Sequence, residues 1–232
     1  MDYLLLIEDR RDEASRATVD VVEMGKFARE LREAGVLLGS AGPLVPEREG
    51  ARVRIRDGKV LVTDGPFAET KEIVCGYFIV SAESRDAALE IAKRCPYARA
   101  GLVELREAGS SRADSVSAGA PRFLILLREG PHPELRDGKT EYADMAAYVA
   151  GLQRDGHYLE SAGLPRQARS ARVELRRGET LVSDGPFGDA KEIVGGLVLI
   201  TARDRAEAIA LASRCPHVTW GCAEVRGVIQ SG

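Results

Sequence analysis

Apolar and polar positions follow one another in the same order twice along the chain. YLLLI at 3–7 is a continuous apolar run and predicts a buried strand. Four apolar residues then recur at the spacing of one helical face: Met24, Phe27, Ala28 and Leu31. Gly35 stands where a C-cap glycine ends such a helix. The second half of the chain repeats this helix with Met145, Tyr148, Val149, Leu152 and Gly156.

The next segment, ARVRIRDGKVLV at 51–62, alternates with a period of two and predicts a β-hairpin. Asp57-Gly58 is a strong signal for its turn. We expect its valine and isoleucine side chains to face the core. We expect its arginines to form a solvated strand face; they are Arg52 and Arg56 and their repeats Arg172 and Arg176. The alternative is that the arginine pair grips a carboxylate or phosphate. Another apolar strand follows, then a helix for which Ser84 or Asp204 is the N-cap, then a last strand.

The repetition identifies a duplicated domain. Residues 51–106 recur at 171–226, 120 positions later. We therefore assign one repeat to 1–106, a Ser/Ala/Gly-rich flexible linker to 107–121, and a second repeat to 122–229. The order of elements predicts an α+β fold of two ferredoxin-like repeats, each with an inserted hairpin. Because one face of each sheet needs a cover, we expect the two sheets to stack as an intrachain pseudo-dimer.

Composition narrows the function classes. The net charge of −3 and pI near 5.8 argue against a nucleic-acid partner, and an apolar run of membrane-spanning length is missing from the sequence. Four cysteines without paired spacing favour neither a disulfide framework nor a zinc site. The opening residues do not have the pattern of a signal peptide. We expect a cytoplasmic protein without a metal or other cofactor.

The most distinctive segment occurs once per repeat, as VTDGPFAETKEIV at 62–74 and VSDGPFGDAKEIV at 182–194. Asp-Gly-Pro-Phe suits a turn, with Phe67 as an apolar anchor. A turn does not require the acid–x–Lys–Glu tail, and such a tail beside a cleft could bind an anion. We take Asp64 and Asp184 as candidate general bases. The candidate ligand-binding residues are Phe67, Glu69, Lys71, Glu72, Phe187, Asp189, Lys191, Glu192, Ser40 and Ser161.

Histidine and cysteine offer further candidates. All three histidines lie in the second repeat, and His157, which precedes a predicted strand, is the one candidate catalytic histidine. Cys95 and Cys215 recur in Arg-Cys-Pro, but their helical spacing points them to the core, at a helix C-terminus whose dipole opposes a thiolate. We expect both cysteines to be structural.

The segment DGPFAETKE at 64–72 resembles the signature of the YCII-related, or DGPF, family. The resemblance covers both repeats over most of their length, and the second copy departs only at 188–190. It implies the dimeric α+β barrel fold. Some relatives are lyases or dehalogenating enzymes thought to use a His–Asp pair. Because the first repeat contains no histidine, a symmetric two-site mechanism of that kind is excluded here.

Three functions follow as expectations. The first is binding of a small, anionic ligand between the stacked sheets. The second is a cofactor-free lyase or isomerase that uses Asp184, Lys191 and Glu192 with His157, or the equivalent acid–lysine set of the first repeat. The third is a protein-interaction scaffold, since family members resemble partners of transcription-initiation factors. We expect a small-molecule partner, neither nucleic acid nor membrane, and either a monomeric pseudo-dimer or a homodimer of it.

Overall fold

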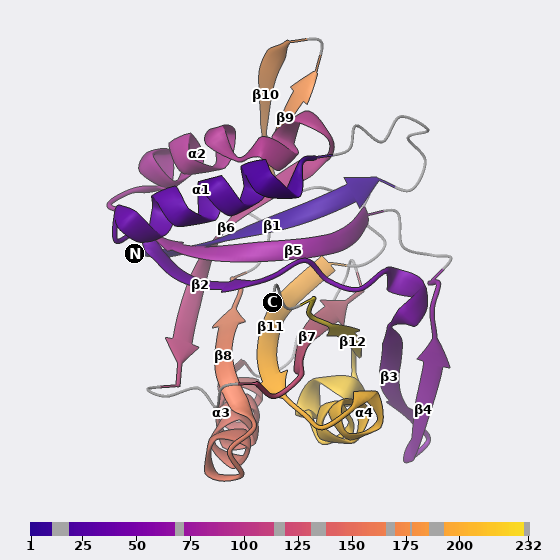
Figure 1. Cartoon of the computed structure of the whole chain (residues 1–232). Helices are drawn as coiled ribbons and strands as arrows, with labels where there is room; N and C mark the ends of the chain where they lie inside the picture. Colours follow the sequence, from indigo (N-terminus) through magenta and orange to yellow (C-terminus); the bar gives the residue numbers. More distant parts are fainter. Residues whose placement is uncertain are drawn as a thin grey trace. The chain divides into compact units, whose positions relative to one another are not determined.

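The computed structural model describes residues 1–10, 19–67, 72–113, 119–130, 138–165, 170–176, 178–185 and 193–229. It contains two compact units that do not coincide with the two sequence repeats (Figure 1). Unit 1 holds Met1–Ala41, Thr70–Ser110 and Leu164–Asp189. Unit 2 holds Gly42–Glu69, Ser111–Gly163 and Ala190–Gly232.

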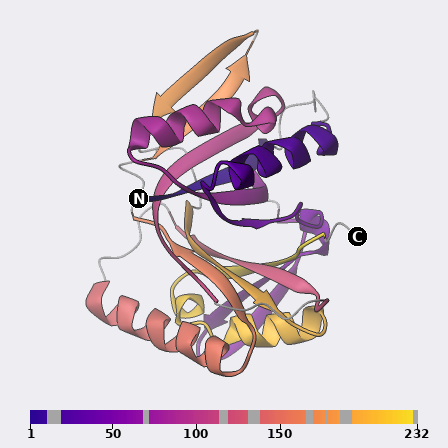
Figure 2. The same cartoon turned by 60° about the vertical axis from the view of Figure 1, so that its left-hand side comes forward.

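Unit 1 is an antiparallel sheet with the strand order β2-β5-β1-β6-β9-β10. The strands are β1 (Asp2–Arg10), β2 (Leu37–Ala41), β5 (Glu72–Ser81), β6 (Leu102–Arg112), β9 (Ala171–Arg176) and β10 (Glu179–Asp184). Helices α1 (Val21–Glu33) and α2 (Arg85–Arg94) cover one face of this sheet, as Figures 1 and 2 both show. A 3-10 helix, η2 (Pro96–Arg99), follows α2.

Unit 2 repeats this plan with the strand order β8-β11-β7-β12-β3-β4. The strands are β8 (Tyr158–Gly163), β11 (Ile193–Thr201), β7 (Arg122–Glu129), β12 (Cys222–Gly227), β3 (Ala51–Arg56) and β4 (Lys59–Asp64). The helices are α3 (Gly138–Arg154) and α4 (Arg205–Ser213), with the 3-10 turns η1 (Glu47–Glu49) and η4 (Pro216–Thr219). The βαββαβ core of each unit confirms the predicted ferredoxin-like α+β class. The stacking of the two sheets stays a prediction.

Local sequence signals set the ends of the helices. Ser84 caps α2, because its hydroxyl accepts a hydrogen bond from the Ala87 amide at 3.1 Å. Asp204 caps α4 in the same way, accepting from the Glu207 amide at 2.8 Å. The Glu207 carboxylate accepts from the amide of Arg203, one residue before the cap, at 2.6 Å. These two bonds form a capping box shifted by one residue.

The hairpin of each repeat belongs to the unit that holds the rest of the other repeat. Strand β3 pairs with β12, so that Val53 lies opposite Ala223. Strand β9 pairs with β6 in the equivalent register, and Val173 lies opposite Val103. Each sheet is therefore completed by one hairpin from a distant part of the sequence.

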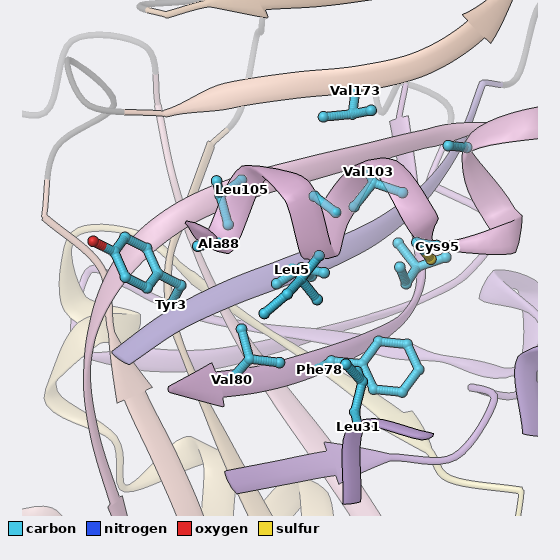
Figure 3. Packing of buried hydrophobic residues seen from close by; sticks show 14 of the residues in the cluster. Tyr3, Leu5, Leu31, Phe78, Val80, Ala88, Cys95, Val103, Leu105 and Val173 are labelled. Atoms are coloured by element: carbon cyan, nitrogen blue, oxygen red, sulfur yellow. The ribbon is translucent and has the colours of Figure 1, made fainter. Parts of the chain in front are cut away.

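The hydrophobic cores include the exchanged hairpins. Figure 3 shows Val173 of β9 beside the core residues Val103, Leu105 and Ala88 of unit 1. Val53 of β3 occupies the corresponding core of unit 2, and both valines are fully buried. Burying such a side chain contributes about 1.5–3 kcal/mol.

The expected linker begins later than its composition predicts. Strand β6 continues to Arg112, and its pairing with β1 includes Ala108 opposite Asp2. The Ser110 hydroxyl also donates to the Asp2 carboxylate. Serine and glycine at 109–111 are therefore part of strand β6, and residues 114–118 lie outside the described residues. Among the helices in the described ranges, none is long and apolar enough to cross a membrane.

The exchange predicts that neither repeat folds alone as a monomer. A fragment of residues 1–113 would lack β9, which pairs with the side of β6 away from β1. A fragment of 119–232 would lack β3, which pairs with the side of β12 away from β7. We expect each purified fragment to lack a cooperative thermal transition as a monomer. Mixing the two should restore the circular dichroism spectrum and the elution volume of the intact chain. A monomeric fragment with a cooperative transition would contradict this prediction.

Candidate functional site

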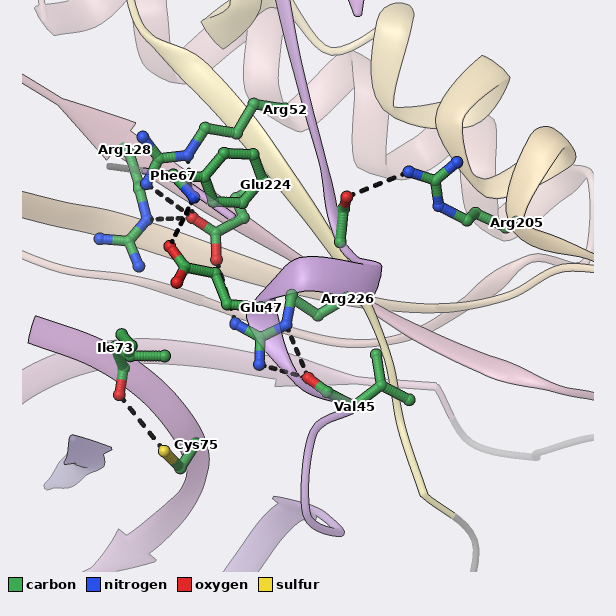
Figure 4. A network of polar contacts seen from close by, with 11 residues as sticks. Val45, Glu47, Arg52, Phe67, Ile73, Cys75, Arg128, Arg205, Glu224 and Arg226 are labelled. Carbon is green, nitrogen blue, oxygen red and sulfur yellow. Dashed lines mark hydrogen bonds and ion pairs between the residues drawn. The ribbon is translucent and has the colours of Figure 1, made fainter. Parts of the chain in front are cut away.

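Three arginines meet one glutamate in the sheet of unit 2 (Figure 4). Arg52 of β3 donates to Glu224 Oε2 through Nε at 3.1 Å and Nη2 at 2.9 Å. Arg128 of β7 donates to the same oxygen at 2.7 Å, and Arg226 of β12 donates to Oε1 at 3.3 Å. The Glu224 side chain is 1% exposed. We call these four residues the arginine cluster.

The first DGPF segment packs against this cluster. The Cζ atom of Arg52 lies 4.1 Å from the centre of the Phe67 ring, a cation–π contact. The Phe67 amide donates to Glu47 Oε1 at 3.2 Å, and Figure 4 shows both residues beside the arginine cluster. Arg226 also donates through Nε to the Val45 carbonyl at 2.9 Å. Phe67 is buried, which confirms its predicted role as an anchor.

Unit 1 holds the counterpart of the arginine cluster. Arg172 of β9 binds the Glu72 carboxylate with both of its Nη atoms, at 2.9 and 2.7 Å. Its Nε donates to Glu104 Oε2 at 3.2 Å. Arg106 donates to the Pro165 carbonyl at 2.5 Å, as Arg226 does to Val45 at the equivalent position. We call Glu72, Glu104, Arg106 and Arg172 the glutamate cluster.

The two clusters give their equivalent central glutamates opposite properties. Burial raises the pKa of Glu224, but the three guanidinium groups outweigh burial, and its pKa lies below that of an ordinary glutamate. Burial also raises the pKa of Glu104, and two arginines offset that only in part while Glu72 adds to it. The pKa of Glu104 is therefore raised.

One position accounts for much of this difference. Residue 128, which is Arg in unit 2, corresponds to residue 8, which is Glu in unit 1, and both side chains are buried. Arg128 lowers the pKa of Glu224. Glu8 instead lies close enough to Arg172 to raise the pKa of that arginine, together with Glu104 and Glu72 and against the effect of burial. The duplicated site has thus become rich in arginine in one unit and in glutamate in the other.

The prediction that the hairpin arginines form a solvated face is wrong for Arg52 and Arg172. Arg52 is buried, and the Arg172 side chain is 13% exposed. In the sheet, Arg52 lies opposite Glu224 and Arg172 lies opposite Glu104. Sequence alternation identified their shared strand face but not the strand from the other repeat that covers it. The sequence offered one signal for this pairing. Arg52 and Glu104 both recur 120 residues later, as Arg172 and Glu224.

The two candidate general bases occupy equivalent exposed ion pairs. Asp64 accepts from Arg205 at the start of α4, and Asp184 accepts from Arg85 at the start of α2. The aspartate side chains are 74% and 72% exposed. Each pair joins the end of an exchanged hairpin to a helix of the same unit, which is a structural arrangement.

The glycine of the first DGPF segment is required by close packing. The Gly65 amide donates to the Gly50 carbonyl at 3.1 Å. A Cβ atom at position 65 would lie 2.1 Å from the Glu47 carbonyl oxygen, which is closer than any real contact. Gly185 donates to the Ser170 carbonyl at 2.9 Å in the second copy. The turn interpretation of these residues therefore accounts for their geometry.

The remaining candidates are dispersed or lie outside the described residues. His157 Nδ1 is 2.9 Å from the Thr201 carbonyl, which fixes its ring beside the end of β11. The Ser161 hydroxyl is 2.9 Å from the Tyr158 hydroxyl, and Ser40 lies in β2 opposite Phe78. The predicted residues outside the described ranges are Glu69, Lys71, Phe187, Asp189, Lys191 and Glu192. Among the described residues, no group of three or more His, Cys, Asp or Glu could hold a metal ion.

Cys95 and Cys215 are structural, as predicted. Both thiols are buried in the cores, and Cys215 donates to the Met145 sulfur at 3.7 Å. Burial raises the pKa of Cys95 to about 11 and that of Cys215 to about 12. Such thiols carry little thiolate at neutral pH.

Comparison with known proteins places this architecture in a family. The model of the YCII-related domain matches residues 1–108 and again 122–231, so the chain belongs to the YCII-related domain family as a tandem copy. The uncharacterized protein R00369 of Rhizobium meliloti (strain 1021) is 39% identical over 71 residues, which are 31% of this chain and 56% of the relative. The chain thus spans about half the length of that relative.

A solved structure, "Crystal structure of Putative Chlorite dismutase TA0507", superposes with a TM-score of 0.40 at 10% identity. The superposition covers 99% of this chain and 94% of that one.

The opposite pKa directions of the two central glutamates predict different costs of neutralising them. In the folded state the Glu224 pKa is lowered, so its contribution to stability is present above the unfolded-state pKa and is lost as pH falls. The Glu104 pKa is raised, so folding favours its protonated form, and its contribution is lost as pH rises through the folded-state pKa. We expect Glu224→Gln to lower the free energy of unfolding at pH 7 by about 3–5 kcal/mol, as when one partner of a buried ion pair is removed.

Glu104→Gln is the matched control and should cost clearly less at the same pH, because glutamine resembles the protonated form that folding favours. Urea unfolding of both variants and the wild type at several pH values between acid and neutral measures this. Equal losses in the two variants at pH 7 would contradict the prediction.

The cysteine environments predict slow reaction with thiol reagents. In the native protein at pH 8, Cys95 and Cys215 should react far more slowly than partly exposed Cys75, because their thiols are buried and their pKa values raised. Time-resolved labelling with a thiol-specific reagent, with peptide mass spectrometry to locate the label, measures the rates. All four cysteines should react quickly in urea. Native labelling of Cys95 as fast as Cys75 would refute its buried placement.

Proposed function

We propose that the protein binds a small carboxylate-bearing molecule at the arginine cluster of unit 2. The observation that carries the proposal is the convergence of Arg52, Arg128 and Arg226, from three neighbouring strands, at one buried place. All three guanidinium groups contact the carboxylate of the buried Glu224. A buried, guanidinium-rich surrounding favours an anion, because charge interactions are stronger away from water.

The glutamate cluster supplies a chemical precedent for the ligand. Arg172 occupies the strand position that corresponds to Arg52, and it holds the Glu72 carboxylate end-on, with one hydrogen bond from each Nη atom. This two-pronged arrangement is how arginine recognises a planar carboxylate. A small carboxylate ligand is chemically equivalent to the Glu72 side chain. Glu192, the counterpart of Glu72 in the second repeat, lies outside the described residues.

Phe67 extends the proposed site with an apolar surface. Its ring lies against the guanidinium group of Arg52, and its amide is held by Glu47. An aromatic surface beside an arginine suits a ligand with a short hydrocarbon part next to its carboxylate. The first DGPF segment would thus contribute to binding through Phe67, as its sequence led us to expect.

Binding is better supported than acid–base catalysis. The two aspartates that a lyase or isomerase would use as bases are engaged in exposed ion pairs with Arg205 and Arg85. His157 is oriented by a backbone carbonyl. These contacts support structural roles for all three residues.

The test exploits the duplication. Arg52→Lys and Arg172→Lys make the same change at equivalent positions, keeping the positive charge and removing the planar fork. We expect a panel of small mono- and dicarboxylates to include compounds that stabilise the wild type. At 100 times its dissociation constant such a compound raises the free energy of unfolding by about 2.7 kcal/mol. For a chain of this size, each kcal/mol raises Tm by roughly 2–4 °C. Arg52→Lys should lose most of this shift, whereas Arg172→Lys should keep it.

Isothermal titration of the best compound then gives its affinity for each variant, and each variant's own Tm without ligand serves as the baseline. The proposal fails if no carboxylate stabilises the wild type. It also fails if both variants lose the shift to the same degree.

A further inference from the structure

Exposed apolar side chains gather on the two terminal strands of the sheets. The large hydrophobic residues exposed among the described ones are Met1, Val21, Val22, Val60, Leu61, Val62, Tyr142, Leu181, Val182 and Ile229. Half of these lie on β4 or β10, and each is the last strand of its unit's sheet. On β4, three consecutive residues, Val60, Leu61 and Val62, are 47–50% exposed.

We propose that β4 pairs with β4 of a second copy of this chain, forming a homodimer through a continuous sheet. Strand β4 is bonded on one side to β3, in a regular register from Ala51 opposite Asp64 to Arg56 opposite Lys59. The described strand contains neither a proline nor a bulge, which are devices that commonly protect an edge. Figure 1 shows it at the end of the unit 2 sheet.

The hairpin geometry determines which backbone groups face outward. Asp57 and Gly58 both have positive φ, 50° and 70°, as in a two-residue hairpin turn. The residues that flank such a turn form a hydrogen-bonded pair, and bonded and non-bonded pairs then alternate. The bond from the Gly65 amide to the Gly50 carbonyl fits the same alternation. The backbone amides and carbonyls of Val60 and Val62 therefore point to the outer edge.

The sequence of β4 is self-complementary in an antiparallel pair. Val60-Leu61-Val62 reads the same in both directions, so a twofold axis at Leu61 places each valine opposite a valine of the second copy. Lys59 then lies opposite Thr63 of the second copy, so like charges do not face each other. Shifting the register by two residues would place Val60 opposite Asp64, which is less favourable.

This symmetry selects a second copy of the chain, and β4 in particular. A twofold pair uses one patch twice and closes on itself, whereas β4 paired with β10 of another copy would leave a free edge at each end and grow into a polymer. Strand β10 has threonine in place of the first valine, and Glu179 in place of Lys59. Its self-pairing would place Thr180 opposite Val182, so it offers a less apolar edge than β4.

Substitution at the proposed axis gives a direct test. In Leu61→Lys, two lysines would face each other across the axis, so we expect the dimer to be lost. Leu181→Lys makes the same change at the equivalent position of β10 and should leave the dimer intact. Sedimentation velocity over a range of micromolar concentrations measures the mass of each. Because both leucines are exposed, we expect each variant to keep the Tm of the wild-type monomer.

A mixture of charge variants distinguishes the proposed pair from other dimers. Leu61→Lys and Leu61→Glu should each be monomeric, and an equimolar mixture should form a heterodimer, because lysine then faces glutamate across the axis. The proposal is overturned if the wild type is a monomer at every concentration, or if Leu61→Lys remains a dimer. It is equally overturned if Leu181→Lys abolishes association, or if the wild type forms open-ended polymers.

Discussion

Pairing between the hairpin of one repeat and the last strand of the other is the constraint on which this structure depends. It places Arg52 opposite Glu224 in unit 2 and Arg172 opposite Glu104 in unit 1. Without it, the buried valines of the first strand of each hairpin would have no core to enter, and each buried glutamate would lose one of its arginines, Arg52 or Arg172. Removing such a partner leaves an uncompensated buried charge, which is far more costly than losing an exposed ion pair.

The contacts of the DGPF segment hold the end of the exchanged hairpin in place. Its aspartate accepts from an arginine at the start of a helix, through Asp64 and Arg205 in unit 2 and through Asp184 and Arg85 in unit 1. In the first copy its glycine approaches the Glu47 carbonyl too closely for a side chain. Its phenylalanine covers Arg52. Residues that form a turn and residues that contribute to the proposed ligand site are therefore the same residues.

Duplication has allowed two equivalent sites to diverge in charge. Position 8 is Glu in unit 1, and the equivalent position 128 is Arg in unit 2, while the order of the strands is the same in both units. The central glutamate nevertheless has a raised pKa in unit 1 and a lowered pKa in unit 2. The terminal strands have diverged in the same way, with a self-complementary apolar edge on β4 and a more polar one on β10. A single chain can thus keep one copy for stability while the other acquires a partner or ligand.

The sequence alone determined the two-repeat organisation, the ferredoxin-like class, the hairpins, the helix caps at Ser84 and Asp204, and the burial of Phe67, Cys95 and Cys215. These depend on local periodicity and turn chemistry, which are written in consecutive residues. Only the tertiary structure decided which repeat receives each hairpin, and hence that Arg52 and Arg172 are buried and not solvated. That choice depends on pairing between strands more than 60 residues apart, and alternation within one strand carries no information about the strand beside it.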